Sequence, residues 1–311
     1  GTGIVVRQDE CEVIGKPEGV VLIYNPKEWK PDTPSHQRYQ PLWHGAKYNL
    51  KSRHILKPGK PPLPKSAHRP EGFYKDIFMN GGVNLSSRRS LPAAESAGFS
   101  YELYAGRDAD KQRELIAGND FDNNGVLLYP DGQPRFRLIY VNGGGATAHG
   151  KTLELAGRKV LRQFYNNGGS YSGSCAGSFL SGRNTNTNSM RRLGYLHIFP
   201  YNTLTSGIKK TRLGHVIPHE SPLLKYDDFG GDYYVPDIYH NNGNWLSQNL
   251  IEKMKHVEVL ATYDLPKNKV HEGAAIWAYK KDKAAGRIVN IGSHPEGSTS
   301  GEKLQITEAC F

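Results

Sequence analysis

The sequence predicts an α/β fold in three layers, in which helices cover both faces of a mostly parallel sheet. From about residue 76, short apolar runs alternate with segments of helical periodicity, and this alternation is typical of a parallel sheet covered on both faces. Several apolar runs also end on glycine-rich turns, as residues 136–141 do at Asn142-Gly143-Gly144, and glycine is a common end signal for a strand.

The composition favours a globular protein of one large domain or two ordinary ones. The chain has 311 residues, of which 37% are hydrophobic, and a chain of this length can bury a sizeable core. Its net charge is +10, but the basic residues are scattered and their short clusters lack interleaved aromatic residues. We therefore expect no nucleic-acid partner. No apolar run approaches the length of a membrane-spanning helix, and the composition leaves the oligomeric state open.

The first 75 residues differ in pattern from the rest. One apolar run at residues 20–24 predicts a strand, and a tract rich in proline, lysine and histidine follows it up to residue 70. Because proline fixes φ and lacks a backbone donor, this tract is not helical. We expect residues 1–75 to be an irregular N-terminal extension packed on the core, and residues 76–311 to form the α/β domain.

The elements of the α/β domain follow from apolar runs and from 3.6-residue spacing. They are strands at 76–79, 99–104, 136–141 and 257–261, helices at 89–97 and 152–166, and a late β-hairpin of residues 274–279 and 287–291. The tyrosine-, glycine- and asparagine-rich stretch at 226–244 is expected to be a long irregular loop, and such loops often carry function.

Residues 169–180 predict a short strand, a sharp turn at Cys175 and a helix. Gly173-x-Cys175-x-Gly177 has the form of a nucleophile elbow, in which a strained turn exposes a reactive side chain. Strand and helix nearly touch at such a turn, which explains the small neighbours. The amide of Ala176 then begins a helix and is a donor for an oxyanion. The alternative is a glycine- and serine-rich loop around a buried structural cysteine.

A cysteine nucleophile needs a base, and the base needs a group that orients it. His294 lies just past the second strand of the predicted hairpin, and Glu296 is two residues further along. A side chain at the end of a strand reaches a site at the edge of the sheet. We therefore predict that the fold brings His294 and Glu296 to Cys175.

Together these motifs resemble the class I glutamine amidotransferase-like superfamily, and most closely its biotin-protein-ligase N-terminal-like branch. The resemblance rests on residues 140–144, 168–177 and 294–296 and extends over residues 75–300. It implies a flavodoxin-like fold and a cysteine-dependent hydrolase that acts, without a cofactor, on an amide or related acyl bond of a small-molecule or peptide-like substrate. The implied site comprises the nucleophile Cys175, the base His294, the orienting acid Glu296, and oxyanion-hole amides of Gly143, Gly144 and Ala176.

The resemblance also implies a loop that reaches over the elbow. On that likeness we expect His240, Asn241 and Asn242, which lie in the 226–244 stretch, to line the substrate cleft. A plain surface turn is the alternative for these three residues.

A second motif competes with the elbow. Residues 145–152 match the phosphate-binding pattern G-x-x-x-x-G-K-T, and they lie between a predicted strand and a predicted helix, as that motif requires. In this interpretation the loop from Gly145 to Gly150 cradles phosphates, Lys151 reaches the β and γ groups, and Thr152 holds Mg²⁺, with Asp264 as a metal-side acid. A nucleotide-binding protein is thus one alternative function, and a non-catalytic binding protein on the same fold is another.

The two remaining cysteines, Cys11 and Cys310, lie near opposite ends of the sequence. Domain termini are often close in space, so a Cys11–Cys310 disulfide with Cys175 left free accounts for all three, and two unrelated thiols are the alternative. The disulfide would imply a secreted, periplasmic or other oxidising compartment.

One histidine pair has metal-binding spacing. His215 and His219, with Glu220 adjacent, would share a face of a helix and could bind a metal ion. Pro218 between them argues against a helix, and we therefore predict no metal site.

Overall fold

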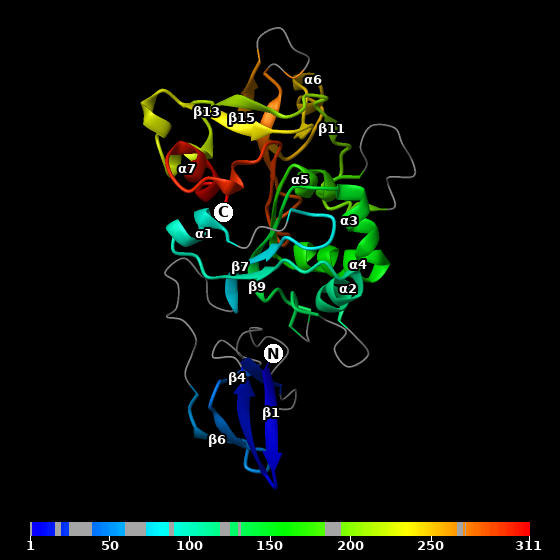
Figure 1. Cartoon of the computed structure of the whole chain (residues 1–311), viewed down its shortest axis with the longest axis vertical. Coiled ribbons are helices and arrows are strands. Elements are labelled where there is room, and N and C mark those ends of the chain that lie inside the picture. Colours follow the sequence, from blue (N-terminus) through cyan, green and yellow to red (C-terminus); the bar gives the residue numbers. More distant parts are fainter. Residues whose placement is uncertain are drawn as a thin grey trace. The chain divides into compact units, whose positions relative to one another are not determined.

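The computed structural model describes residues 2–15, 20–24, 39–59, 73–86, 90–118, 125–129, 132–183, 194–265, 270 and 272–311. The chain forms two compact units, Gly1–Phe73 and Tyr74–Phe311 (Figure 1). No helix in the described ranges is both long enough and apolar enough to span a membrane.

The N-terminal unit is built of strands. An antiparallel sheet in the order β1-β2-β5-β6 contains Thr2–Arg7, Glu10–Gly15, Lys47–Asn49 and His54–Lys57, and β3 (Val20–Tyr24) pairs with β4 (Tyr39–Trp43). A small core of Cys11, Val13, Leu42, Ala46 and Tyr48 holds them together.

This finding corrects the expectation of an irregular extension. Only β3 was predicted. Of the strands that were missed, β1 and β6 are almost wholly exposed and lack a buried apolar face. Residues 60–70 of the proline-rich tract lie outside the described residues. That this unit packs on the α/β domain stays a prediction.

The second unit contains a sheet of nine described strands. Five of them are parallel neighbours in the order β8-β7-β9-β10-β17, and their bounds are Tyr101–Tyr104, Lys75–Asn80, Phe136–Val141, Ser170–Ser174 and Ile288–Ile291. Numbered along the chain, this order is 2-1-3-4-5, which is the flavodoxin-like order. The predicted fold class is therefore confirmed.

Four antiparallel strands extend the sheet beyond β17. They are β16 (Ala274–Tyr279), β15 (Val257–Asp264), β12 (Thr211–Val216) and β13 (Tyr234–His240). The antiparallel pairing of β16 with β17 confirms the predicted hairpin.

The prediction of one irregular loop at 226–244 was wrong, because residues 234–240 of this stretch form the strand β13. Val235 and Ile238 are buried, but Asp237 has a φ of 65° and the pairing with β12 shifts register. These irregularities break the alternating pattern by which a strand is recognised. Pro236 is tolerated because β13 is an edge strand.

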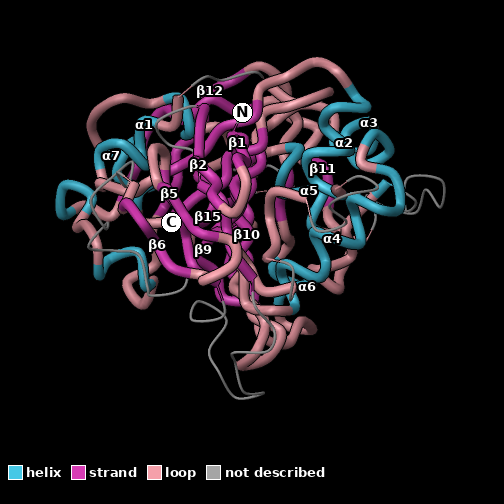
Figure 2. Tube along the Cα trace, turned by 90° about the horizontal axis from the view of Figure 1, so that it is seen from below, coloured by secondary structure: helices cyan, strands magenta, loops and turns pink. Residues whose placement is uncertain are grey.

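Helices cover both faces of the sheet. Figure 2 shows α1 (Pro92–Ser96) and α7 (Glu302–Glu308) on one side of the sheet. On the other side lie α2 (Ala109–Ala117), α3 (Ala146–Thr152), α4 (Glu154–Asn166) and α5 (Ala176–Ser181). The short elements are β11 (Leu204–Thr205), β14 (Asn244–Trp245), α6 (Gln248–Ile251) and the 3₁₀ helices η3 (Pro222–Lys225), η4 (Phe229–Gly231) and η5 (Pro295–Gly297).

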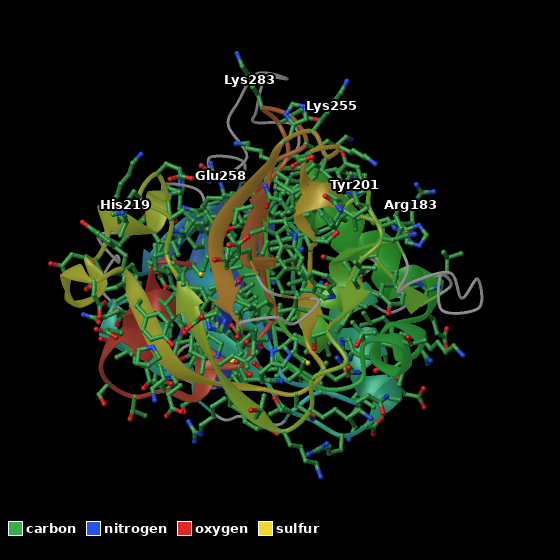
Figure 3. All side chains as sticks on the ribbon, turned by 90° about the horizontal axis from the view of Figure 1, so that it is seen from above. Arg183, Tyr201, His219, Lys255, Glu258 and Lys283 are labelled. Atoms are coloured by element: carbon green, nitrogen blue, oxygen red, sulfur yellow. The ribbon has the colours of Figure 1, made fainter. Side chains whose placement is uncertain are left out.

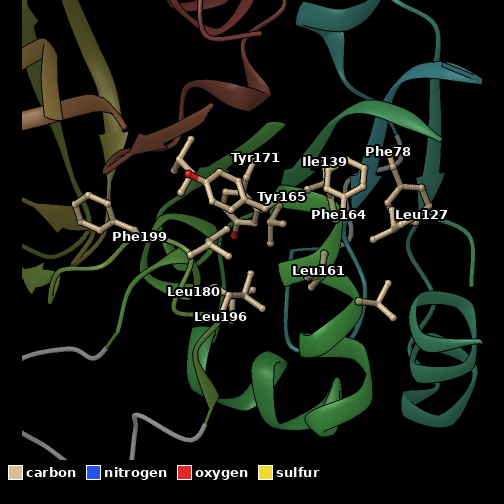
Figure 4. Close-up of a cluster of buried hydrophobic side chains, with 14 of the residues drawn as sticks. Phe78, Leu127, Ile139, Leu161, Phe164, Tyr165, Tyr171, Leu180, Leu196 and Phe199 are labelled. Atoms are coloured by element: carbon tan, nitrogen blue, oxygen red, sulfur yellow. The ribbon is translucent and has the colours of Figure 1, made fainter. Parts of the chain in front are cut away.

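The main core lies between α4, α5 and the sheet. Leu161 and Phe164 of α4 belong to one buried cluster with Tyr171 of β10 (Figure 4). Val160 and Phe164, which have helical spacing in the sequence, are both buried on this face, whereas Ala156, which shares the spacing, is exposed. Complete burial of a side chain such as Phe164 stabilises the fold by about 1.5–3 kcal/mol. This packing fixes β10, and hence the turn that follows it.

Candidate active site

The candidate site lies at the carboxyl edge of the parallel strands. β9, β10 and β17 are parallel neighbours, so the segments that follow them emerge at one edge of the sheet. Those segments carry Gly143 and Gly144 after β9, Cys175 after β10, and His294 after β17. The fold therefore brings together residues that are far apart in the sequence.

Cys175 occupies a sharp turn between β10 and α5. Its φ is 45° and its ψ is −102°, a backbone conformation that costs a residue with a side chain about 1–3 kcal/mol. A methyl group on Gly173 would meet the backbone of Gly177, and one on Gly177 would collide with the carbonyl oxygen of Val141. The strand and the helix thus approach as closely as the elbow pattern predicts. Cys175 is 7% exposed, and its thiol donates a hydrogen bond to the Asn241 carbonyl oxygen at 3.8 Å.

His294 lines the same cavity as this thiol, and Glu296 contacts the imidazole of His294. His294 Nδ1 is 3.1 Å from Glu296 Oε1, and the carboxylate is 1% exposed. Burial lowers the pKa of His294, but hydrogen bonds with Cys175 and Glu296 outweigh burial and raise it to about 10. The ring is therefore protonated on both nitrogens, as an imidazolium, at neutral pH. Because Nδ1 faces Glu296, Nε2 is the nitrogen that can face Cys175.

Two of the predicted oxyanion donors, Gly143 and Gly144, border the same cavity as Cys175, and the third, Ala176, directly follows Cys175 in the chain. Ala176 is the first residue of α5, so its amide has no partner within the helix. Gly144 has a φ of 143° and forms an isolated antiparallel bridge with Leu85. In that bridge Ser86 N donates to Gly143 O and Gly145 N donates to Asn84 O. Neither bond uses the amides of Gly143 and Gly144, which keeps them available to an oxyanion.

A cavity of about 410 Å³, which we call the elbow pocket, opens onto the thiol. Its lining residues are Asn84, Leu85, Ser86, Arg107, Gly143, Gly144, Cys175, Tyr239, Asn241 and His294. The volume is in the range of sites for small molecules. The ring of Tyr239 lies 5.6 Å from that of His294, at an interplanar angle of 40°.

Sequence reasoning missed the contributions of residues 84–86, Arg107 and Tyr239. Residues 84–86 follow β7 and Arg107 follows β8, and the carboxyl ends of both strands lie at the same edge of the sheet as that of β9. The order of the strands in the sheet would have indicated these residues, but that order is known only from the strand pairing in the structure.

The three predicted cleft residues have different positions. Asn241 lines the elbow pocket. His240 is buried, and its ring nitrogens lie 2.8 Å from Ser206 Oγ and 3.0 Å from Ser293 Oγ. Asn242 Oδ1 accepts hydrogen bonds from Thr205 Oγ1 and the Gly207 amide. His240 and Asn242 thus hold the turn in place rather than line the cleft, which corrects that expectation.

The phosphate-loop interpretation is wrong. From Ala146 onward residues 145–152 form the helix α3 instead of an open loop, and His149 N donates to Gly145 O. Thr152 Oγ1 donates to Ala148 O, and the Lys151 side chain is exposed. Three strands separate Asp264, at the end of β15, from β9. The glycines at 143–145 serve the turn after β9, which is why the pattern matched.

The predicted disulfide is also wrong, because Cys11 and Cys310 are free thiols. Each is buried in the core of its own unit, Cys11 with Val13 and Tyr48, and Cys310 with Ile306 and Val289. The prediction of an oxidising compartment thereby loses the disulfide on which it rested.

The histidine pair at 215 and 219 does not form a helix. His215 lies in β12 and is fully buried against Tyr263, and burial lowers its pKa to about 3. His219 is exposed, and Figure 3 shows it at the periphery. In the described part of the chain, no three His, Cys, Asp or Glu side chains are grouped so as to hold a metal ion.

A second cavity, of about 470 Å³, lies at the amino ends of β9 and β10. It is lined by residues such as Arg137, Ser170 and Arg287. None of the residues around Cys175 borders it, so we assign the chemistry to the smaller elbow pocket.

Comparison with known proteins found matches among solved structures but none among protein families or curated sequences. The chain is similar to the solved structure of a ThuA-like protein from Bacteroides uniformis ATCC 8492, with 14% identity and a TM-score of 0.44 over 79% of this chain and 94% of that chain. It is also similar to a glutamine amidotransferase, with 11% identity and a TM-score of 0.45 over 74% of this chain and 96% of that chain. A third similar structure is the glutaminase domain of CTPS from Trypanosoma brucei, with 10% identity and a TM-score of 0.42 over 76% of this chain and 93% of that chain. One of these neighbours is a glutamine amidotransferase and another is a glutaminase domain, and the likeness of this chain to the biotin-protein-ligase branch stays a prediction.

Proposed function

We propose that the protein is a cysteine-dependent hydrolase of an amide or related acyl bond. The observation that carries the proposal is that Cys175 and His294 line one pocket while the imidazole of His294 is bonded to the buried carboxylate of Glu296. This is the arrangement of a nucleophile, a base and an orienting acid.

In the first half-reaction, the proton of Cys175 already resides on His294, and the sulfur attacks the carbonyl carbon as a thiolate. The carbonyl π electrons move to the oxygen, which accepts hydrogen bonds from Ala176 and from Gly143 or Gly144. When the tetrahedral intermediate collapses, the carbon–nitrogen bond breaks and the imidazolium gives its proton to the leaving amine. The raised pKa of His294 keeps that proton in place at neutral pH.

In the second half-reaction, the neutral imidazole takes a proton from water, and the resulting hydroxide attacks the thioester carbon. The carbon–sulfur bond breaks and the carboxylic acid product departs. His294 now carries the proton taken from water, so the imidazolium and the thiolate of the starting state are restored. Glu296 stabilises the imidazolium in both halves, because its carboxylate accepts from Nδ1.

The rival is a non-catalytic binding protein on the same fold. The two functions differ in the reactivity of Cys175, which an acyl probe such as a p-nitrophenyl ester measures directly. We expect one equivalent of p-nitrophenol to be released rapidly per chain, with the acyl group on Cys175.

Three variants sharpen this test. Cys175→Ala removes the labelled atom, and His294→Gln is expected to slow acylation by about 10²-fold or more. His219→Gln is the matched control, since that histidine is exposed and remote from the pocket. Acylation at other residues, or at Cys175 without any dependence on His294, would favour the binding protein.

A further inference from the structure

His240 is a second histidine close to the candidate site, and the reaction proposed above does not use it. It is the last residue of β13 and is fully buried. Burial is the main cause that lowers its pKa to about 4, and the charge of His294 adds to that effect. At neutral pH the imidazole is therefore uncharged, and it carries a single proton on Nδ1 or on Nε2.

The neighbouring donors determine which nitrogen has that proton. The Gly243 amide donates to Nε2 of His240 at 3.2 Å, and a backbone amide is a donor only. Nε2 is therefore the nitrogen with a free lone pair. Ser206 Oγ, which accepts from the Ile208 amide at 3.2 Å, lies 2.8 Å from the same Nε2 and acts as its second donor. The proton of the ring consequently lies on Nδ1.

The Nδ1 proton faces the residue that precedes the proposed base. Ser293 is fully buried, and its Oγ lies 3.0 Å from Nδ1 of His240, so it accepts this proton in a hydrogen bond. The Ser293 hydroxyl is also bonded to Tyr263, and Tyr263 Oη donates to the carbonyl oxygen of Asn244 at 3.0 Å. Because each hydroxyl in this chain then donates once and accepts once, the order of its protons is fixed from His240 to Asn244.

Backbone contacts hold the same two segments together. The amide of His294 donates to the Tyr239 carbonyl oxygen at 2.8 Å. A methyl group on Gly243 would collide with the carbonyl oxygen of Gly292. The turn that follows β13 and the segment that follows β17 are therefore in close contact, and a change in the hydrogen bonds of one displaces the other.

We propose that His240 positions the base His294 by donating from Nδ1 to Ser293. Ser293 directly precedes His294, so a buried hydroxyl that loses this donor will shift and carry the imidazole with it. His240 acts through Ser293 and is therefore a positioning residue. The inference rests on the proposed function, because it concerns the base of the same site.

Two amide variants separate the two sides of the ring. In His240→Asn the side-chain amide lies near the place of Nδ1 and keeps a bond with Ser293, but the acceptor for Gly243 is lost. In His240→Gln the longer side chain brings its amide to the place of Nε2, and the bond with Ser293 is lost. We expect acylation of Cys175 to be slower in His240→Gln than in His240→Asn, by about tenfold or more, because a small misplacement of a catalytic group has a large effect on rate.

The alkaline limit of acylation distinguishes positioning from a loss of stability. Hydrogen bonds with Cys175 and Glu296 raise the pKa of His294 to about 10, and a displaced imidazole forms them less well. The proton is then lost at a lower pH, so the limit should fall by ~1 unit or more in His240→Gln and stay in place in His240→Asn. The titratable and charged groups around His294 are Cys175, Glu296, Tyr239 and His240, with Arg107 on the same cavity.

Leu223→Ala is the control for lost stability, because this buried residue of η3 borders the second cavity and not the elbow pocket. It should lower the free energy of unfolding in urea and leave the alkaline limit in place. Ser293→Ala removes the other partner of the same bond and should lower the limit as His240→Gln does. This variant also provides the test if a replacement at position 240 prevents folding.

Equal limits in His240→Gln and His240→Asn, or an unshifted limit in Ser293→Ala, would overturn the inference. Acylation of Cys175 that depends on His294 would still support the proposed function in that case. If the wild type is not acylated at Cys175, the proposed function fails, and the positioning role of His240 fails with it.

Discussion

The α-carbon of Gly143 lies against the imidazole of His294: a methyl group at this position would collide with Cε1 of the ring and lie 2.8 Å from Nδ1. The same methyl group would be 3.3 Å from Cβ of Cys175. Glycine after β9 therefore lets the base approach the nucleophile closely, because a side chain at this position would occupy the place of the imidazole.

Gly143→Ala should displace the imidazole and slow acylation of Cys175 by about 10²-fold, since a misplacement of about 1 Å in a catalytic group has that effect. The fold should persist, because the change affects a turn and not the core. The measurements are the acylation rate with a p-nitrophenyl ester and the circular dichroism spectrum.

Gly145→Ala is the control for this change. Gly145 has a φ of −106°, and a methyl group there would have its nearest neighbour, Asn84 O, at 3.6 Å, an ordinary contact. This variant should react like the wild type. Equal losses in the two variants would mean that the turn as a whole, and not the approach of His294, limits the rate.

The local half of this site could be predicted from the sequence. The strand, the turn at Cys175 and the small residues around it follow from steric rules that act within a few residues. For the same reason β9 was predicted with its observed bounds, Phe136–Val141. The histidine and its acid were found because they directly follow a recognisable hairpin.

The non-local half could not be predicted in this way. Arg107 enters the pocket because β8 lies next to β7 at the edge of the sheet, and strand order leaves no local pattern. His240 resembles a cleft residue in sequence, yet pairing of β13 with β12 and the two serine hydroxyls hold it inside. The match of residues 145–152 to the phosphate-binding pattern gave a wrong prediction, because a sequence motif does not specify the backbone conformation. In this protein, residues 146–152 form a helix.

Replacement of Glu296 by glutamine should move the alkaline limit of activity to lower pH. The hydrogen bond and the charge of Glu296 both help to raise the pKa of His294, which is about 10. A neutral amide favours the imidazolium less, so the proton is lost at a lower pH, by ~1 unit or more. The pH dependence of Cys175 acylation measures this limit.

Glu258→Gln, which alters an exposed ion pair with Arg287, is the control and should leave the alkaline limit in place. An unshifted limit in Glu296→Gln would mean that Glu296 does not orient His294.

The three thiols should react very differently with N-ethylmaleimide in the folded protein. Burial raises the pKa of Cys310 to about 12 and also raises that of Cys11, so both thiolates are scarce at neutral pH. We expect rapid modification of Cys175 alone, and modification of all three after unfolding in guanidinium chloride without reductant. A single reactive thiol in the unfolded chain would mean that a disulfide is present after all.

The strained turn makes a prediction about stability that is independent of the reaction. Cys175 has a φ of 45°, a region that glycine adopts at little cost and that a β-carbon disfavours. Cys175→Gly and Cys175→Ala both remove the nucleophile, and they differ only in that β-carbon. The glycine variant should therefore have the larger free energy of unfolding, by about 1 kcal/mol. The free energy gained by relief of the backbone strain exceeds the free energy lost because glycine increases the entropy of the unfolded chain.

Urea denaturation of the two variants measures the difference. If the alanine variant were equally stable or more so, the backbone at Cys175 would not be strained, and the geometry of the elbow would have to be reassigned.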